Sequence, residues 1–373
     1  MSGQVVKRGD RKYLVRVSLG KGADCKRKYY NKTINGTKKE AEAFKNKILH
    51  QVDTGTFYEP SREYFRDFID NWFKTVARDR VSDKTLRGYE QSTRLYLIPN
   101  LGTTQLERIT PEQIQKLYYE MREKGLSSST IKNVHAVLNS ALKQAVRWGK
   151  INRNPAALVD LPRNKKTEMK VLNQEEAKRF LDTAIYNRLK SLFSLLITTG
   201  MRPGEALALK WNDIDFENNR ITINKSLSRV DGKWSLKEPK TSHGRRTIPV
   251  PSEVMKDIKE HKELQDHEKV GLKTNDYSDH DFVYATKTGE PFNDRNIISQ
   301  YFKPLLKNAG LPDIRLYDLR HTCATLLLSA GVNPKIVSER LGHADVSLTL
   351  NTYSHVLPDM QESAAKKIEG MLF

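Results

Sequence analysis

The spacing of apolar residues changes twice along this chain of 373 residues, and each change indicates a different kind of secondary structure. Up to about residue 57, short runs such as KYLVRVSLG are typical of strands. From about residue 63 to 157 the apolar residues recur at helical intervals, and from about 170 helices surround a stretch of short strands. A polar, basic, Pro-interrupted stretch, INRNPAALVDLPRNKKTEMK, indicates a linker before the last segment. The chain is therefore expected to fold as several domains.

The predicted architecture is multidomain and mainly helical. Residues 1–57 are expected to form a small basic α+β domain, with a three-stranded sheet and one helix. Residues 63–160 predict an all-α domain, and residues 170–373 a mainly α domain with a small antiparallel sheet. Capping residues predict several helix starts: Thr37, Ser82, Thr110 followed by Pro111, and Asn173. Asp231-Gly232 predicts a hairpin turn.

The charge of the chain indicates a polyanionic partner. The formal net charge is +19 and the pI is about 9.6. Residues 1–60 alone hold 14 lysines and arginines against 6 acidic residues. A merely soluble basic surface is the alternative. Nucleic acid is favoured over a membrane surface, because no strongly apolar helix face accompanies the basic residues.

Two further features of the sequence indicate the cellular compartment of the protein. No apolar run approaches the length of a membrane span, and the first residues, MSGQVVKRGDRK, lack the apolar segment of a secretory signal. Cys25 and Cys323 lie far apart and have neither a disulfide pattern nor metal-ligand spacing. These features predict a cytosolic protein.

The stretch TTGMRPGEALAL places an arginine between two apolar segments. Gly200 is typical of the residue that ends a helix, and Pro203 of the first residue of the next. Arg202 is therefore expected beside a helix N-terminus, where Glu205 can face it. An internal Arg–Glu pair is one interpretation. The other is a seat for an anion such as phosphate.

Three more polar residues stand in apolar surroundings, and a lysine lies between the two arginines. Arg320 follows Asp318 near a predicted helix start, and His343 and Tyr353 lie in LGHADVSLTLNTYSH. Lys240 lies at a strand end or turn in PKTSHGRRTIPV. Taken singly, the tyrosine indicates packing, the lysine a solvated surface and the histidine a turn cap. Together they are residue types suited to phosphoryl chemistry.

These motifs resemble the tyrosine recombinase (phage integrase) family, most closely the integrases of Gram-positive temperate phages and conjugative transposons. The stretches TTGMRPGEALAL, PKTSHGRRTIPV, YDLRHTCATLLL and LGHADVSLTLNTYSH occur in the family's order. The resemblance covers the whole chain. It implies that residues 1–57 are an arm-type DNA-binding domain, 63–160 a core-binding domain and 170–373 the catalytic domain.

The resemblance also implies a role for each residue. Arg202 and Arg320 would clamp the scissile phosphate, and Tyr353 would form a 3′-phosphotyrosyl link. Lys240 would protonate the leaving 5′-hydroxyl, and His343 would donate to a phosphate oxygen. Glu205 would orient its neighbours. No cofactor and no metal are expected, because the arginines would stabilise the negative charge on the phosphate that Mg²⁺ stabilises in other enzymes.

One position departs from the family pattern. Three residues before Arg320 the family usually has histidine, whereas this chain has Tyr317. A phenol is a poorer base than imidazole near neutral pH, although it can donate a hydrogen bond. Tyr317 is therefore expected in the site, with its part in proton transfer open. His321 is interpreted as structural, because adjacent residues on a helix point about 100° apart.

The predicted function is a site-specific integrase that cuts and rejoins DNA to integrate and excise a mobile element. The alternatives are a DNA-binding regulator that has lost catalysis and a metal-dependent transposase or nuclease. Double-stranded DNA at core and arm sites, a homotetramer on DNA, an excisionase and a DNA-bending host protein are the implied partners. The expected location is the bacterial cytoplasm, at the nucleoid. The tail, with Ile368, Met371, Leu372 and Phe373, is expected either to dock on a neighbouring copy or to pack on its own domain.

Overall fold

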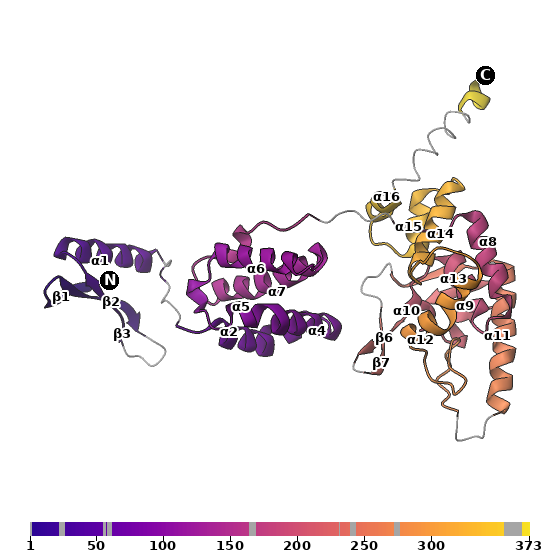
Figure 1. Ribbon diagram of the computed structural model, residues 1–373, viewed down its shortest axis with the longest axis horizontal. Coiled ribbons are helices and arrows are strands. Elements are labelled where there is room, and N and C mark those ends of the chain that lie inside the picture. The colour runs from indigo at the N-terminus through magenta and orange to yellow at the C-terminus, as the bar shows by residue number, and fades with distance from the viewer. Residues whose placement is uncertain are drawn as a thin grey trace. The chain divides into compact units, whose positions relative to one another are not determined.

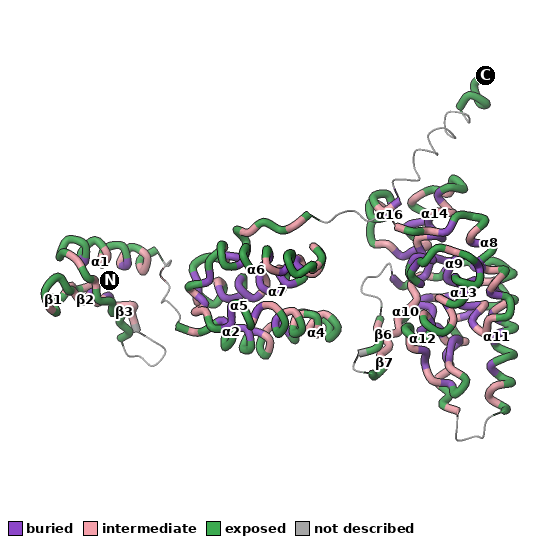
Figure 2. The backbone as a smooth tube through the Cα atoms, in the orientation of Figure 1, coloured by how far each residue is buried: buried purple, intermediate pink, exposed green. Residues whose placement is uncertain are grey.

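The computed structural model describes residues 2–21, 27–54, 57, 62–163, 169–230, 232–238, 244–271, 277–353 and 368–373. The chain divides into two compact units, Met1–Lys166 and Thr167–Phe373. Within the parts, buried residues lie on the inward faces of the helices and strands (Figure 2). None of the described helices is long and apolar enough to cross a membrane.

The first unit begins with the predicted three-stranded sheet and helix (Figure 1). Strands β1 (Gly3–Gly9), β2 (Lys12–Lys21) and β3 (Arg27–Asn35) are antiparallel in the order β1-β2-β3. Helix α1 (Lys38–Asp53) starts at the expected capping box of Thr37 and Glu40. One face of the sheet packs with α1 in a small apolar cluster; its buried members are Val15, Val17, Tyr30, Ala41 and Ile48. The other face carries polar and basic side chains.

A helical module with its own apolar core follows in the same unit. Its caps at Ser82 and Thr110 are those that the sequence predicts. Two of its helices contain a π turn, which the apolar spacing does not predict. Its elements are α2 (Phe65–Trp72), η1 (Phe73–Ala77), α3 (Arg78–Arg80), α4 (Asp83–Ser92), η2 (Thr93–Leu97), α5 (Ile98–Leu101), η3 (Leu106–Arg108), α6 (Pro111–Glu123), α7 (Ser128–Arg147) and η4 (Pro155–Leu158).

The second unit is mainly helical and carries two small sheets. Strands β4, β5 and β8 form one sheet in that order, and β6 pairs with β7 as a hairpin. A large apolar cluster joins the helices to the three-stranded sheet. The elements are α8 (Gln174–Thr183), η5 (Ala184–Tyr186), α9 (Lys190–Thr199), α10 (Pro203–Ala206), η6 (Trp211–Asp213), β4 (Ile214–Asp215), β5 (Arg220–Ile223), β6 (Ser226–Val230), β7 (Lys233–Lys237), β8 (Arg246–Pro249), α11 (Ser252–Val270), α12 (Asp294–Asn296), η8 (Ile297–Phe302), α13 (Lys303–Asn308), α14 (Asp318–Ser329), α15 (Pro334–Leu341) and α16 (Val346–Tyr353).

The described end of the tail is exposed. Ile368, Met371, Leu372 and Phe373 have exposed fractions of 57%, 80%, 71% and 101%. Docking on a neighbouring copy and packing on the same domain both stay predictions for these side chains.

A buried histidine makes the stability of the second unit depend on pH. His261 on α11 is 4% exposed, and its Nε2 lies 3.0 Å from the carbonyl oxygen of Val283. Burial, reinforced by Arg188, lowers the pKa of His261 to about 4. Because the unfolded chain has a histidine pKa near 6.5, it binds the proton first as the pH falls.

We expect the free energy of unfolding to fall by about 1.4 kcal/mol per pH unit from this group between about pH 6.5 and 4. Above pH 6.5 His261 does not contribute to the pH dependence of the free energy of unfolding. Urea unfolding at pH 7, 6 and 5 measures the effect, with His261→Gln as the matched variant. Equal slopes for both proteins would show that His261 is protonated in the folded state.

Candidate active site

The predicted helix break around Arg202 is confirmed. Gly200 ends α9 in the left-handed conformation, with φ of 66°, and Pro203 is the first residue of α10. Arg202 caps α10, and the Glu205 carboxylate accepts a hydrogen bond from its backbone N–H at 3.0 Å. The same carboxylate accepts a bond from Arg202 Nη1 at 2.6 Å. The internal Arg–Glu pair is therefore present, and the rest of the site shows that it does not stand alone.

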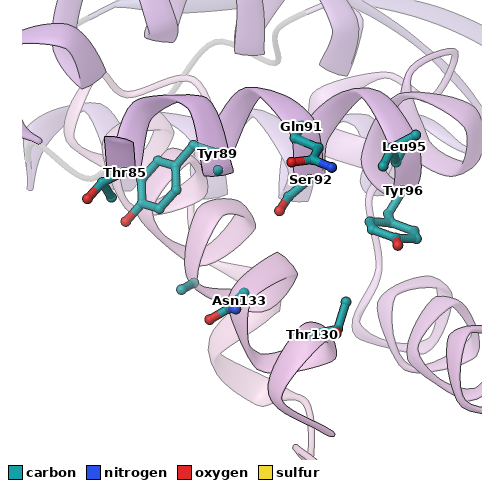
Figure 3. A pocket seen from close by; sticks show the side chains of 10 residues that line it. Thr85, Tyr89, Gln91, Ser92, Leu95, Tyr96, Thr130 and Asn133 are labelled. Atoms are coloured by element: carbon teal, nitrogen blue, oxygen red, sulfur yellow. The ribbon is translucent and has the colours of Figure 1, made fainter. Parts of the chain in front are cut away.

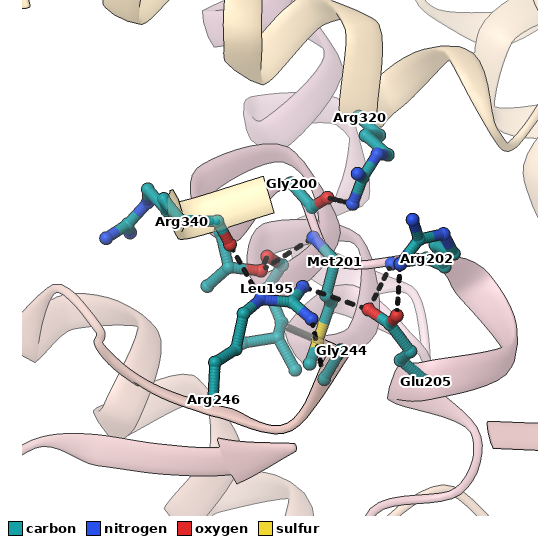
Figure 4. A network of polar contacts seen from close by, with 10 residues as sticks. Leu195, Gly200, Met201, Arg202, Glu205, Gly244, Arg246, Arg320 and Arg340 are labelled. Carbon is teal, nitrogen blue, oxygen red and sulfur yellow. Dashed lines mark hydrogen bonds and ion pairs between the residues drawn. The ribbon is translucent and has the colours of Figure 1, made fainter. Parts of the chain in front are cut away.

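Glu205 is shared between two arginines. It is 3% exposed, and its Oε2 also accepts a bond from Arg246 Nη2 at 3.0 Å. Arg246 lies on β8, and its Nε donates to the carbonyl oxygen of Arg340 at 2.8 Å. Burial alone would raise the pKa of Glu205, but Arg246 and Arg202 outweigh it and hold that pKa below its usual value. Figure 4 shows this carboxylate between the two guanidinium groups.

Arg320 on α14 is the most deeply buried cation of the site, at 1% exposed. Its Nη1 donates to the carbonyl oxygen of Gly200 at 2.8 Å, as Figure 4 shows. Its Nη2 is buried and has no hydrogen-bond partner among the described residues. Burial and the repulsion of Arg202 lower the pKa of Arg320 to about 10, so the group stays charged at neutral pH.

The charges of this cluster do not balance. Arg202 and Arg246 share the carboxylate of Glu205, while the nearby guanidinium of Arg320 is bonded to the carbonyl oxygen of Gly200. A buried charge without a partner is costly, so the cluster favours an anion from outside. Among the residues that the structure describes, no group of three His, Cys, Asp or Glu side chains could hold a metal ion. The arrangement is suited to a phosphate group, which a guanidinium binds through two parallel hydrogen bonds.

Tyr353, the last residue of α16, lies beside this anion seat. Its side chain is 1% exposed and packs with an apolar cluster; the buried members are Ala324, Leu328, Val337 and Leu341. Its hydroxyl lies 2.7 Å from Nδ1 of His321. Burial raises the pKa of Tyr353, and the charge of Arg320 opposes that rise. The phenol is therefore protonated and near the arginines.

The sequence interprets His321 as structural, and the structure places it in contact with the site. His321 and its neighbour Arg320 do point in different directions. Tyr317 is the relevant comparison, since it lies four residues earlier and caps α14, which puts it on the same face one turn away. The rings of Tyr317 and His321 lie 5.4 Å apart. Tyr317 is 39% exposed, and its hydroxyl interacts with the guanidinium of Arg202.

His343 also reaches the site. It follows Gly342, which ends α15 in the left-handed conformation, and its Nδ1 lies 2.7 Å from Oγ1 of Thr349. Burial, followed by Arg320 and Arg202, lowers the pKa of His343 to about 4. His343 is therefore neutral at pH 7 and can offer one N–H to an anion. The structure thus brings Arg202, Tyr317, Arg320, His343 and Tyr353 together.

Lys240 lies outside the described residues. The hairpin of β6 and β7 precedes it, and Trp234 on β7 packs edge-on against Phe282 at 5.8 Å. The other side of the hairpin touches α10: a Cβ added to Gly204 would lie 2.8 Å from the carbonyl oxygen of Leu227. The lack of a side chain at Gly204 therefore lets the hairpin approach the helix that Arg202 caps.

We expect Gly204→Ala to lower the activity of this site by about 10-fold or more, because it pushes β6 away from α10. Affinity for the anionic ligand should change far less, since few contacts are lost. Gly271→Ala is the control, because its added Cβ meets nothing closer than 3.6 Å. Single-turnover rates of both variants measure the effect, and equal rates would show that the position of the hairpin does not affect activity.

Three residues that contact the site are not predicted from the sequence as its members. Arg246, Thr349 and His321 contact Glu205, His343 and Tyr353, respectively. Arg246 stands in the quoted motif PKTSHGRRTIPV, where its position on an alternating strand could have indicated an inward side chain. Thr349 carries no such signal, because only the packing of α16 brings it to His343.

The helical module of the first unit has a groove of its own. It has a volume of about 490 Å³ and lies between α4 with η2 on one side and α7 on the other (Figure 3). Its lining mixes polar and apolar side chains and has no charged residue; the polar members other than tyrosine are Thr85, Gln91, Ser92, Thr130 and Asn133. Side chains of this kind can hydrogen-bond base edges or phosphates.

The chain matches known families and proteins along most of its length. Residues 170–360 match the phage integrase family, and residues 64–122 match the N-terminal SAM-like domain of phage integrases. The chain is 33% identical to a tyrosine recombinase XerC-like protein of Caldanaerobacter subterraneus subsp. tengcongensis, across 98% of each chain. It is 26% identical to the ICEBs1 integrase of Bacillus subtilis, across 96% of this chain and 97% of that one.

Solved structures show the same fold. An integrase fragment of the Tn1549 transposon, in complex with transposon right end DNA, superposes with a TM-score of 0.70 at 24% identity. That match covers 82% of this chain and 100% of the fragment. The lambda integrase tetramer bound to a Holliday junction gives a TM-score of 0.58 at 18% identity, over 92% and 94% of the two chains. The chain belongs to the phage integrase family and is a tyrosine-type site-specific recombinase.

Proposed function

We propose that this chain cuts and rejoins double-stranded DNA through a 3′-phosphotyrosyl link to Tyr353, and so integrates and excises a mobile element. The observation that carries the proposal is the buried, unpaired Nη2 of Arg320 beside Arg202. A phosphate placed there would lie next to the phenol of Tyr353. The mobile-element relatives, such as the ICEBs1 integrase, support the biological setting.

The site suggests how charge is handled during the reaction. Arg202 and Arg320 bind the two non-bridging oxygens of the scissile phosphate, and His343 and Tyr317 donate further hydrogen bonds. Negative charge grows on these oxygens as Tyr353 attacks, and the excess of guanidinium groups stabilises it without rearrangement. Glu205 and Arg246 hold Arg202 in place. Lys240 protonates the leaving 5′-oxygen.

The domains of the chain have separate roles in binding DNA. Residues 63–160 serve as the core-binding domain, with the uncharged groove between α4 and α7 as the surface that reads core sites. Residues 1–57 serve as the arm-type domain and residues 170–373 as the catalytic domain. The relatives' DNA complexes and the lambda tetramer support a homotetramer on paired sites. An excisionase and a DNA-bending host protein assist at the nucleoid, in the bacterial cytoplasm.

The open face of the N-terminal sheet offers an arginine fixed for base contact. Arg16 donates from Nε to Asn31 Oδ1 at 2.9 Å, and its guanidinium lies 5.5 Å from the centre of the Tyr29 ring. A rigid fork of this kind matches the major-groove edge of guanine. We expect Arg16→Ala to weaken arm-site binding by about 10-fold or more and to relax sequence preference, while core-site binding stays unchanged. Gel-shift titrations on both site types measure this.

The test of the proposed function is a covalent trap. Nicked duplexes that carry the attachment site flanking the gene are incubated with the protein in EDTA, and the products are separated under denaturing conditions. We expect a protein–DNA adduct on the 3′ side of the cut. A protein that binds this DNA without any adduct would be a regulator. Cleavage that disappears in EDTA would indicate metal-dependent chemistry.

A further inference from the structure

His321 contacts the very oxygen that would attack DNA. Its Nδ1 lies 2.7 Å from the hydroxyl of Tyr353, and the two rings lie 5.7 Å apart at 57°. The histidine belongs to α14 and the tyrosine to α16, so the bond joins two helices. Tyr353 is 1% exposed, and an imidazole nitrogen is thus the partner of its buried hydroxyl.

His321 lies near the position where the family pattern has a histidine that this chain lacks. The family pattern has histidine where this chain has Tyr317, and a phenol does not accept a proton near neutral pH. His321 lies one turn further along α14 on the same face, and its ring meets that of Tyr317 edge-on at 65°. An imidazole is therefore available in the site, moved by one helical turn.

We propose that His321 is the general base of this recombinase, the group that takes the proton of Tyr353 during DNA cleavage. The inference rests on the proposed function. In the step, Tyr353 Oη forms a bond to phosphorus while the bond from phosphorus to the 5′-oxygen breaks. The phenolic proton passes to Nδ1 of His321, and the 5′-oxygen takes a proton from Lys240. On rejoining, the 5′-hydroxyl forms a bond to phosphorus and gives its proton to Lys240, while the bond from phosphorus to Tyr353 Oη breaks and His321 returns its proton to the departing phenol.

The surroundings of His321 suit a base. It must be neutral, with its proton on Nε2, for Nδ1 to accept. Its charged and titratable neighbours are Tyr317, Asp318 and Arg320 on α14, Arg315 just before that helix, Tyr353 on α16, and His343. Burial lowers the pKa of His321, and the two arginines add to this effect against the opposing charge of Asp318.

The experiment compares His321→Gln with wild type in single-turnover cleavage of the nicked attachment site. Each is measured on an ordinary phosphodiester and on a duplex with sulfur in place of the 5′-bridging oxygen. A thiolate leaves without a proton, so this substrate rescues loss of the general acid but not loss of the base. We expect His321→Gln to slow cleavage by about 10²-fold on both substrates, whereas Lys240→Ala is rescued by sulfur.

Two further measurements separate a base from a positioning residue. The wild-type rate should fall at low pH as His321 takes up a proton, and this limb should vanish in His321→Gln. Adding Tyr317→His to His321→Gln should recover at least about 10-fold, since imidazole returns to the usual position. His261→Gln, which changes a buried histidine outside the site, is the control and should cleave normally.

Several results would overturn the proposal. A loss below about threefold in His321→Gln, rescue of that variant by sulfur, or survival of the low-pH limb would each exclude His321 as the base. Failure of Tyr317→His to recover activity, with folding shown intact by circular dichroism, would point to positioning of Tyr353 instead. Absence of an adduct with wild-type protein would instead refute the proposed function.

Discussion

Replacing Tyr353 with phenylalanine is expected to abolish the covalent protein–DNA adduct. The change removes the attacking oxygen, and loss of a nucleophile lowers turnover by about 10⁴-fold or more. The ring remains to fill the cluster around Leu341 and Val337, so the protein should fold. Only the hydrogen bond to His321 is lost, at a cost of about 1 kcal/mol.

Two readouts check this result together. Denaturing gels detect the adduct, and gel shifts measure DNA affinity, which should stay within about twofold of wild type. Tyr301→Phe is a suitable control, because Tyr301 packs on the large apolar cluster of the same unit away from the anion seat. An adduct that persists in Tyr353→Phe would assign the nucleophile to another residue.

Replacing Arg320 with lysine is expected to lower the cleavage rate by about 10²- to 10³-fold. Lysine keeps the positive charge, but one ammonium cannot both donate to the Gly200 carbonyl oxygen and present a second donor to phosphate. Arg320→Lys is preferred to alanine because a buried void could unfold the unit. Rates are measured on the nicked attachment site at saturating protein.

Arg340→Lys is the matched control for this prediction. Arg340 is a partly buried arginine at the same helix end, and its Nη2 donates to the carbonyl oxygen of Thr198 at 3.0 Å. Loss of that bond should lower thermal stability with a smaller effect on the rate. If both variants lost cleavage equally and melted at equally lowered temperatures, Arg320 would be a structural residue.

Local features of the fold could be predicted from sequence because their causes are local. The caps at Thr37, Thr110 and Asn173 each depend on a side chain and a backbone N–H three residues apart. The break between Gly200 and Pro203 depends on the backbone preferences of those two residues alone. The π turns were not predictable in this way, since one inserted residue leaves the apolar stripe nearly unchanged.

The site could be predicted only in part. Arg202, Arg320, His343 and Tyr353 stand out as polar residues in apolar stretches, and motif order relates them to one another. The partner of each depends on tertiary packing: Arg246 reaches Glu205 from β8, 41 residues away in sequence. The contact of His321 with the site follows from Tyr317, which lies one turn earlier on the same face, and not from its neighbour Arg320, which points elsewhere.

The packing of Tyr353 has a consequence for the lifetime of broken DNA. The phenol fills space among Ala324, Leu328, Val337 and Leu341. Any motion that moves the phenol out toward a DNA strand leaves a void in this cluster, at a cost on the order of 2 kcal/mol. The apolar packing therefore favours return of the Tyr353 side chain to its buried position, and so favours the rejoined DNA strand over the cleaved one.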